Sequence, residues 1–331
     1  MYLRTELTIP PSNWKITQDT RVLTLGSCFA EVMGQQLQHT KLSVLNNPFG
    51  TIFNPVSIAH LLEQSIENQA IDNVLFVQNQ DIWFHYDFHS SFWGSTQTGC
   101  QTALQAQVAA VHACLKATDL VIITLGTAFA YRHLATGKIV ANCHKMPAQL
   151  FQKQLLTVAE IVEAFQKLHK TIKIQNQKLK IIFTVSPVRH TRDTLPLNQV
   201  SKATLRMACH ELPQILPDCF YFPSYEIMLD DLRDYRFYKP DLIHPNEVAE
   251  AHIFEQFANT YFDQKLSTFA DEWRKIRQAM AHTPLQANTA AHRQFLENLL
   301  QKLAHFGQQI DTTHEIAAVK AKLTSSSSTT T

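Results

Sequence analysis

Glycine is scarce in this sequence: the chain has 331 residues, and only eight of them are glycine. Glycine is the residue that most readily adopts left-handed backbone angles, so its positions are informative when it is rare. Three of the eight, Gly26, Gly50 and Gly126, lie in or beside the segments that carry the functional candidates described below.

Strong net charge, long apolar runs and closely paired cysteines are also missing. The net charge of +1 favours neither nucleic acid nor an anionic membrane as a partner. No segment approaches the roughly 18 apolar residues of a membrane-spanning helix, and the first residues lack the apolar core of a signal peptide. The six cysteines are scattered. We therefore expect a cytoplasmic protein with reduced thiols and with no nucleic-acid or membrane partner.

What remains is the composition of a globular protein with 45% hydrophobic residues. Near-continuous apolar runs predict buried parallel strands at 22–25, 119–127, 179–185 and 219–222. Amphipathic segments lie between them, as at 157–175. This alternation predicts an α/β fold, with a mostly parallel sheet covered by helices on both faces.

Shorter patterns predict further elements. A helix is expected to begin at Asn54-Pro55, because asparagine caps helices and proline fits the first helical position. A second strand, two β-hairpins and two more helices are expected at 42–45, 74–88, 129–142, 102–117 and 198–210.

Composition divides the chain into four parts. An irregular lead-in, the strand–helix region, a run of polar helices and a low-complexity Ser/Thr tail are expected at 1–20, 21–262, 263–323 and 324–331. The tail is expected to be disordered. The polar helices form an extension that could serve as a partner surface, including a contact between copies of this chain.

The first candidate for chemistry is Ser27, which follows an apolar strand and Gly26 and precedes an amphipathic helix. A residue at such a turn lies at the carboxyl edge of the sheet, beside helical N–H groups that can stabilise negative charge. The adjacent Cys28 is an alternative nucleophile. The structural alternative is that Ser27 is simply a small residue tolerated at a tight turn.

Asp241-x-x-His244 is the second candidate, located before the last strong helix of the strand–helix region. Acyl transfer by a serine needs a base within hydrogen-bond reach and a group that orients the base. A histidine and a carboxylate three residues apart can supply both. Gly-Ser at a strand end is often only a turn, and Asp-x-x-His is common by chance. The prediction therefore depends on their joint placement, one at the first strand and the other at the last helix of the strand–helix region.

The motifs also resemble a known family, the GSCFA domain family, which is related to the SGNH/GDSL hydrolases. The resemblance covers roughly residues 20–260 in the expected order. Its segments are Gly26-Ser27-Cys28-Phe29-Ala30, Asn47-Pro48-Phe49-Gly50-Thr51, Thr124-Leu125-Gly126-Thr127 with Tyr131, Val140-Ala141-Asn142-Cys143-His144-Lys145, Ser186-Pro187-Val188-Arg189-His190 and Asp241-x-x-His244-Pro245.

The resemblance implies a three-layer α/β/α fold with Ser27 as nucleophile and Asp241 and His244 completing a triad. The oxyanion donors that it implies are the N–H of Ser27, the loop glycine Gly50 and an asparagine. The asparagine block departs from the superfamily pattern, because alanine follows Gly126-Thr127. Asn142, or Asn47 beside Gly50, could take that role.

Other polar residues are candidates for substrate binding: Asn47, Thr127, His144, Arg189 and His190. For His144, Arg189 and His190 the alternative is an ordinary hairpin or loop surface. A further pair, His85-x-x-x-His89, has the spacing of zinc ligands on a helix but lies in an aromatic, strand-like context. We therefore expect no metal and no cofactor. The aromatic residues at 83–93 are expected to form core or a lid, with a stacking platform for a sugar ring as the alternative.

Together these features predict a serine-dependent ester hydrolase. It would remove an O-acyl group, with acetyl as one option, from a carbohydrate or similar polyol ester through an acyl-serine intermediate. Two alternatives stay open: an O-acyltransferase that uses the same triad, and a non-catalytic module that binds a carbohydrate or an acylated ligand.

Overall fold

A five-stranded parallel sheet forms the centre of the computed structural model, which describes residues 5–284, 286 and 289–325. The strands lie in the order β10-β9-β5-β1-β2. Their bounds are β1 Arg21–Gly26, β2 Ser43–Thr51, β5 Leu120–Leu125, β9 Lys180–Val185 and β10 Cys219–Tyr221. In chain order this is the arrangement 2-1-3-4-5, in which the connections reverse direction between the first and third strands, here β1 and β5.

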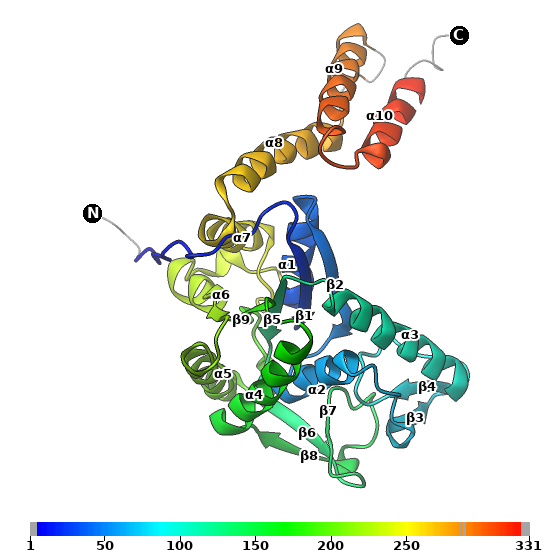
Figure 1. Cartoon of the computed structure of the whole chain (residues 1–331), viewed down its shortest axis with the longest axis vertical. Coiled ribbons are helices and arrows are strands. Elements are labelled where there is room, and N and C mark those ends of the chain that lie inside the picture. The colour runs from blue at the N-terminus through cyan, green and yellow to red at the C-terminus, as the bar shows by residue number, and fades with distance from the viewer. Residues whose placement is uncertain (1–4, 285, 287–288, 326–331) are drawn as a thin grey trace. The chain divides into compact units, whose positions relative to one another are not determined.

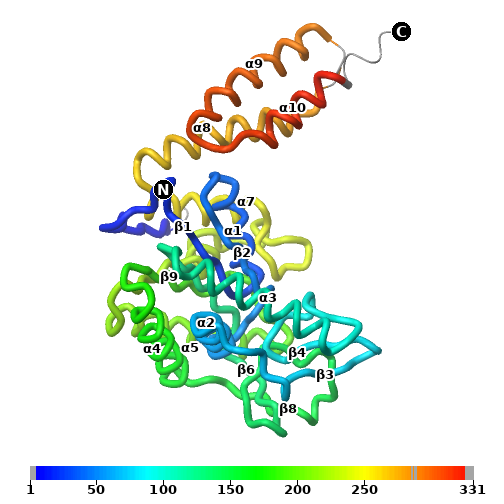
Figure 2. Tube along the Cα trace, turned by 45° about the vertical axis from the view of Figure 1, so that its right-hand side comes forward, coloured from blue at the N-terminus to red at the C-terminus, as the bar shows by residue number. Residues whose placement is uncertain are grey.

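Helices cover both faces of this sheet, and Figures 1 and 2 show the strands between the two helical layers. On one face, alternate strand residues such as Leu23, Ile123 and Phe183 join the main hydrophobic core with α2–α5. On the other face α1 packs closely against the sheet at Gly34. A Cβ at this position would lie 2.1 Å from the Asn46 side chain of β2. The predicted three-layer α/β/α fold is therefore confirmed.

Several helices of this part of the chain begin at side-chain caps. Asn54 caps α2 as expected, and Thr157 forms a capping box with Glu160 at the start of α4. The bounds are α1 Cys28–His39, α2 Pro55–Ile66, α3 Gln97–Leu115, α4 Val158–Gln175, α5 Leu195–Ile215, α6 Ser224–Glu226 and α7 Glu247–Tyr261.

Two small antiparallel sheets extend the core, as the predicted hairpins require. One pairs β3 (Phe76–Asn79) with β4 (Ile82–His85). The other has the order β7-β6-β8, and its bounds are β6 Phe129–His133, β7 Ile139–Val140 and β8 Phe151–Leu155.

Several boundaries differ from those predicted. Strand β2 continues through the Asn47–Gly50 segment to Thr51, and α3 begins at Gln97 because Thr96 caps it. Helix α5 is longer at both ends than the expected 198–210. Strand β8 was not predicted at all. These differences lengthen elements or add one without changing the layers.

The described chain divides into two units. The larger comprises residues up to Trp14, Asp19–Gln38 and Leu42–Tyr261, and it holds the sheet. The smaller comprises Lys15–Gln18, His39–Lys41 and the chain from Phe262 onward. Its helices are α8 Gln264–Ala281, α9 Ala290–Phe306 and α10 Thr313–Ser325.

The smaller unit has a core of its own, in which Trp273 packs edge-on against Phe306 with ring centroids 5.4 Å apart. Helices α9 and α10 run side by side (Figures 1 and 2). Of the expected Ser/Thr tail, residues 326–331 lie outside the described residues. No helix in the described chain has the length and apolar content needed to cross a membrane.

Candidate active site

The carboxyl ends of β1 and β5 mark the candidate site. In open parallel sheets the crevice between the strands where the chain reverses its direction of winding is the usual place for a ligand. Ser27 follows β1 directly, and Gly126 follows β5. The strand order therefore brings two of the sequence candidates to one edge.

Ser27 is held by an unusually tight turn. Gly26 has a φ of +130°, and a Cβ there would lie 2.1 Å from the Thr124 carbonyl oxygen. The Ser27 N–H donates to that same oxygen at 3.0 Å, and the Ser27 Oγ accepts a hydrogen bond from the Phe29 N–H at 3.3 Å. The Ser27 side chain is completely buried. Glycine is thus required at position 26, and the Ser27 N–H is already engaged.

Cys28, the alternative nucleophile, is less buried than Ser27 as a residue. Burial raises the pKa of its thiol, although the Phe29 N–H and the charge of Lys202 oppose that shift. A raised pKa reduces the fraction of reactive thiolate at neutral pH. The geometry therefore does not activate Cys28.

Asp241 and His244 form the hydrogen-bonded pair that the spacing predicts. Asp241 Oδ2 lies 2.7 Å from His244 Nδ1, and its Oδ1 accepts from the backbone N–H groups of His244 at 3.0 Å and Ile243 at 2.9 Å. Hydrogen bonds from these two N–H groups, and then from the imidazole, lower the pKa of Asp241 to about 2. An ionised carboxylate thus fixes the imidazole, leaving Nε2 as the atom available to a nucleophile.

The loop after β9 holds the Asp241–His244 loop in place. The Arg189 N–H donates to Ile243 O at 3.2 Å, and the Arg189 guanidinium donates to Leu242 O at 3.4 Å. The neighbouring His190 lies edge-on to the Phe53 ring, with centroids 4.9 Å apart. Burial, then the charges of Lys202 and His244, lower the pKa of His190 to about 3.

Lys202 is a residue that the motif search missed. This fully buried side chain of α5 donates to Gly126 O at 2.8 Å and to Ser186 O at 2.7 Å, at the ends of β5 and β9. Burial lowers its pKa to about 7. A signal for it existed, because Lys202 occurs at the same helical spacing as the apolar residues Leu205, Cys209 and Leu212. Lys202 ties together the two loops that carry Gly126 and His190.

Between the described Ser27 and His244 side chains there is no hydrogen bond. The two candidates nevertheless share electrostatic neighbours, since the charge of His244 acts on His190 and that of Lys202 acts on both His190 and Cys28, the residue after Ser27. The structure thus assembles the base–carboxylate pair and places the serine at the same region of the sheet edge, but does not join them.

Asn47 lies directly beside the Ser27 turn. Its Oδ1 accepts a hydrogen bond from the Gly26 N–H at 3.1 Å, and its own N–H donates to Thr24 Oγ1 at 3.1 Å. Its Nδ2, by contrast, is a buried donor with no partner among the described residues. The contact with an N–H group fixes which amide atom is the oxygen. Asn47 therefore holds a free donor next to the candidate nucleophile.

Gly50, the glycine implied as an oxyanion donor, has a φ of +69° and lies against His89. A Cβ at Gly50 would come within 2.7 Å of the His89 Cβ. Three residues farther along, Phe53 O accepts hydrogen bonds from the N–H groups of both Gly126 and Thr127. The segment from Gly50 to Phe53 therefore passes across the ends of β1 and β5.

The remaining candidates are engaged elsewhere. The Thr127 hydroxyl lies 2.9 Å from Ser201 Oγ on α5, and Asn142 Oδ1 accepts from the His144 N–H at 2.9 Å. His144 Nε2 donates to His85 O at 2.8 Å, and its ring stacks on Phe84. None of the three side chains is hydrogen-bonded to Ser27 or His244 in the described structure.

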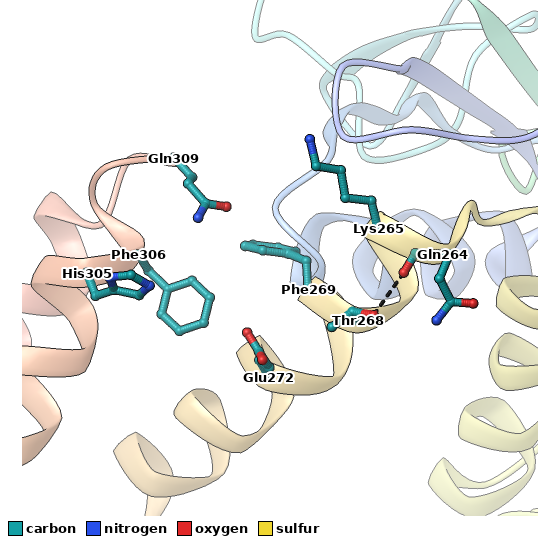
Figure 3. A pocket seen from close by; sticks show the side chains of 8 residues that line it. All are labelled: Gln264, Lys265, Thr268, Phe269, Glu272, His305, Phe306 and Gln309. Atoms are coloured by element: carbon teal, nitrogen blue, oxygen red, sulfur yellow. Dashed lines mark hydrogen bonds between the residues drawn. The ribbon is translucent and has the colours of Figure 1, made fainter.

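A hollow of about 450 Å³ belongs to the C-terminal unit alone. Figure 3 shows Phe269 and Phe306 facing this hollow from α8 and α9, and their rings meet edge-on with centroids 5.7 Å apart. Its other lining residues are Gln264, Lys265, Thr268, Glu272, His305 and Gln309. No nucleophile–base pair lines it.

Comparison with known proteins gives the family. The GSCFA family matches residues 21–257, and the C-terminal domain of GSCFA domain proteins matches residues 273–325. The chain therefore belongs to the GSCFA family. No curated protein matches it.

Solved structures include distant similarities. One is a carbohydrate esterase of family 3 from Talaromyces cellulolyticus, with 10% identity, a TM-score of 0.35 and coverage of 76% of this chain and 99% of the other. Another is a carbohydrate esterase of family 2 with a carbohydrate-binding domain from Corynascus thermopiles (Myceliophthora fergusii). It has 13% identity, a TM-score of 0.39 and coverage of 80% of this chain and 69% of the other.

Proposed function

We propose that this GSCFA protein is a serine esterase that removes an O-acyl group, such as acetyl, from a carbohydrate or similar polyol. The observation that carries the proposal is the Asp241–His244 pair, whose 2.7 Å contact orients an imidazole beside the sheet edge that presents Ser27. A carboxylate that fixes a histidine in one tautomer is the arrangement that serine hydrolases use to generate a base.

The proposed reaction has two halves. His244 Nε2 takes the proton of Ser27 Oγ as this oxygen attacks the acyl carbon, and the same imidazolium then protonates the departing alcohol oxygen. Water, deprotonated by His244, attacks the acyl-serine, and the imidazolium returns this proton to Ser27 Oγ as the bond to the acyl carbon breaks and the acid is released. Asp241 stabilises the imidazolium in both halves. Every proton is carried by these groups, so the scheme uses no cofactor.

The negative charge on the tetrahedral intermediate needs fixed donors. We assign one to Asn47 Nδ2 rather than to Asn142, because the Nδ2 of Asn47 is buried, unpartnered in the described structure and next to Gly26. The Gly50 N–H is the second candidate. The Ser27 N–H would have to leave Thr124 O before it could serve.

The buried Ser27 must also become accessible, and its Oγ must exchange the Phe29 N–H for His244. Hydrogen bonds in empty active sites are commonly long and shorten only when substrate binds. The proposal therefore includes a movement that brings Ser27 and His244 together in the presence of an ester.

Labelling with a fluorophosphonate, which modifies activated serines, tests the proposal directly. We expect the wild type and Cys28→Ala to be labelled at Ser27, and Ser27→Ala to remain unlabelled. Retained labelling of Ser27→Ala with loss in Cys28→Ala would move the nucleophile to Cys28. A folded wild type that is never labelled would favour the non-catalytic binding module, which the burial of Ser27 also favours.

Transfer of the acyl group to another alcohol would use the same triad. The two reactions are separated by supplying an excess of an acceptor alcohol, such as glycerol, with a simple acetate ester. A hydrolase releases mainly acetate, whereas a transferase forms mainly the glycerol ester. We expect acetate.

For the C-terminal unit we propose a contact between copies of this chain. Phe295 on α9 is 37% exposed, although it lies beside the rings of His282 and His292. Sedimentation of the wild type and of Phe295→Glu tests the idea. We expect the wild type to associate and the variant to sediment as a monomer, and a monomeric wild type would contradict the proposal.

A further inference from the structure

A hollow of about 380 Å³ opens beside the loop that carries His244. Arg189 lines it and is at the same time bonded to that loop, through Ile243 O and Leu242 O. Tyr238 also lines it, and pairs across a β-bridge with Pro245, the residue after His244. The hollow and the proposed catalytic base therefore share one wall.

Two tyrosine rings form one side of the hollow. Tyr235 and Tyr238 have ring centroids 5.9 Å apart, and the Arg189 guanidinium lies 5.1 Å from the first and 4.1 Å from the second. Tyr235 is nevertheless 61% exposed. An aromatic face that is held in place by a cation but left open to solvent offers a flat apolar surface to a ligand.

Charged groups of both signs also line the hollow, together with the apolar Met228 and Leu229. Asp230 and Arg233 are exposed at the hollow, and within the described residues neither side chain has a hydrogen bond or an ion pair. One supplies acceptors and the other supplies donors. Such a mixed lining suits a ligand that has both an apolar face and hydroxyl groups, which donate and accept, better than it suits a simple anion.

We infer that this hollow binds the sugar ring that carries the ester. The inference rests on the proposed esterase, in which His244 protonates the departing alcohol, so the alcohol part of the substrate must lie on the His244 side of the site. The C–H face of the sugar lies on Tyr235, and its hydroxyls bind Asp230 and Arg233. The substrate class is thus an O-acylated neutral sugar.

Two acetate esters test the inference. One is 6-O-acetylglucose, and the other is propyl acetate, whose leaving alcohol has neither a ring nor additional hydroxyls. Acetate release would be measured for the wild type, Tyr235→Ala and Tyr235→Phe. We expect Tyr235→Ala to lower kcat/KM for the sugar ester about tenfold through KM, as loss of one aromatic contact would. Propyl acetate should be unaffected, and Tyr235→Phe should match the wild type on both esters.

The matched control is Trp93→Ala. Like Tyr235, Trp93 is a strongly exposed aromatic residue (57%), but it belongs to the aromatic segment 83–93. We expect this variant to treat both esters as the wild type does. A selective loss on the sugar ester in Trp93→Ala would overturn the inference and place the sugar near the β3–β4 hairpin. An equal loss on both esters in Tyr235→Ala would overturn it as well.

Binding without catalysis separates this inference from the esterase proposal. Saturation-transfer NMR would measure glucose and glucuronate binding to Ser27→Ala, with and without Tyr235→Ala. Glucose binding that depends on Tyr235 supports the sugar site even if no ester is hydrolysed. Hydrolysis of 6-O-acetylglucose with glucose binding independent of Tyr235 would refute the site but keep the esterase. Preferential binding of glucuronate would refute a neutral sugar.

Discussion

Asp241 contacts His244 through both of its carboxylate oxygens, one on the imidazole Nδ1 and the other on the backbone N–H. Asp241→Asn keeps the second contact but places an amide against Nδ1, which reverses the imidazole tautomer. Loss of the correct tautomer in serine hydrolases lowers kcat by about 10⁴-fold. We expect a fall of that order here, measured as hydrolysis of an activated aryl acetate.

The matched control is Asp271→Asn in α8, which removes another exposed ion pair three residues apart, with Arg274. It should leave kcat unchanged. Because the backbone N–H groups hold the pKa of Asp241 at about 2, the carboxylate stays ionised across the range of a rate profile. Activity of Asp241→Asn within tenfold of the wild type would remove Asp241 from the mechanism.

Asn47→Asp separates the two functions of Asn47. Aspartate keeps an oxygen for the Gly26 N–H and tolerates the observed φ of 42°, but it has no Nδ2 donor. Loss of one oxyanion donor costs about 100- to 1,000-fold in kcat. We expect such a loss with an unchanged circular dichroism spectrum.

Asn142→Asp is the matched comparison, because it likewise keeps the acceptor for the His144 N–H. We expect it to retain activity. The opposite result, with Asn142→Asp inactive and Asn47→Asp active, would return the oxyanion role to Asn142.

Lys202→Met tests whether one buried ammonium holds the loops together. Methionine fills much of the space but leaves Gly126 O and Ser186 O without their donor. Each unsatisfied buried carbonyl costs about 1–3 kcal/mol, so for the two carbonyls we expect the free energy of unfolding in urea to fall by about 2–6 kcal/mol. Lys116→Met, at an exposed lysine, should change it by less than about 0.5 kcal/mol. An unchanged Lys202→Met would mean that these bonds do not stabilise the fold.

His144 makes stability depend on pH. Its Nε2 donates to His85 O, so a second proton would have to go on Nδ1, which is buried without a partner among the described residues. Burial lowers its pKa to about 4, against 6.5 in the unfolded chain. The unfolded state therefore takes up a proton first as the pH falls. Stability from this residue is complete above pH 6.5 and is lost between pH 6.5 and 4.

Urea unfolding at pH 7 and pH 5 measures this loss. Each pH unit below 6.5 costs about 1.4 kcal/mol per such histidine, so His144 contributes a loss of about 2 kcal/mol at pH 5. His144→Gln should show a pH dependence smaller by that amount, whereas His210→Gln, at an exposed histidine, should behave as the wild type does. Equal pH dependence in His144→Gln and the wild type would contradict the assignment.

The central strands could be predicted well from the sequence because a strand buried on both faces consists of consecutive apolar residues. Strands β1, β5 and β9 are almost wholly buried, so each reads as a continuous apolar run. Strand β8 escaped prediction because it lies in a small antiparallel sheet with mostly exposed polar residues. Its only fully buried member is Phe151, and no local pattern distinguishes such a strand from a loop.

In the candidate site, too, local contacts could be predicted from the sequence and long-range contacts could not. The Asp241–His244 contact is local, so three-residue spacing sufficed to predict it. The partners of Asn47 and Lys202 are 16 to 76 residues away, and only the folded sheet brings them together. Which asparagine keeps a free donor was therefore undecidable from the motifs alone.

Gly26 makes the strongest single prediction about the Ser27 turn. Gly26→Ala would introduce a Cβ 2.1 Å from Thr124 O, at a φ that side chains avoid. Because the obstacle is backbone of the central strand, the turn itself must move. We expect destabilisation by more than about 4 kcal/mol, at the upper end of single substitutions, together with loss of fluorophosphonate labelling at Ser27.

Gly137→Ala is the matched control, since Gly137 also has a positive φ of 68° but a Cβ there would meet nothing within 4 Å. It should cost only the left-handed backbone strain, about 1–2 kcal/mol, and keep full labelling. Urea unfolding and labelling of the two variants measure both effects. If Gly26→Ala were as stable as Gly137→Ala and still labelled, the close approach to Thr124 would not be what positions the serine. In that case the hydrogen bonds of the turn, among them the one from the backbone N–H of residue 26 to Asn47, would be sufficient to position Ser27.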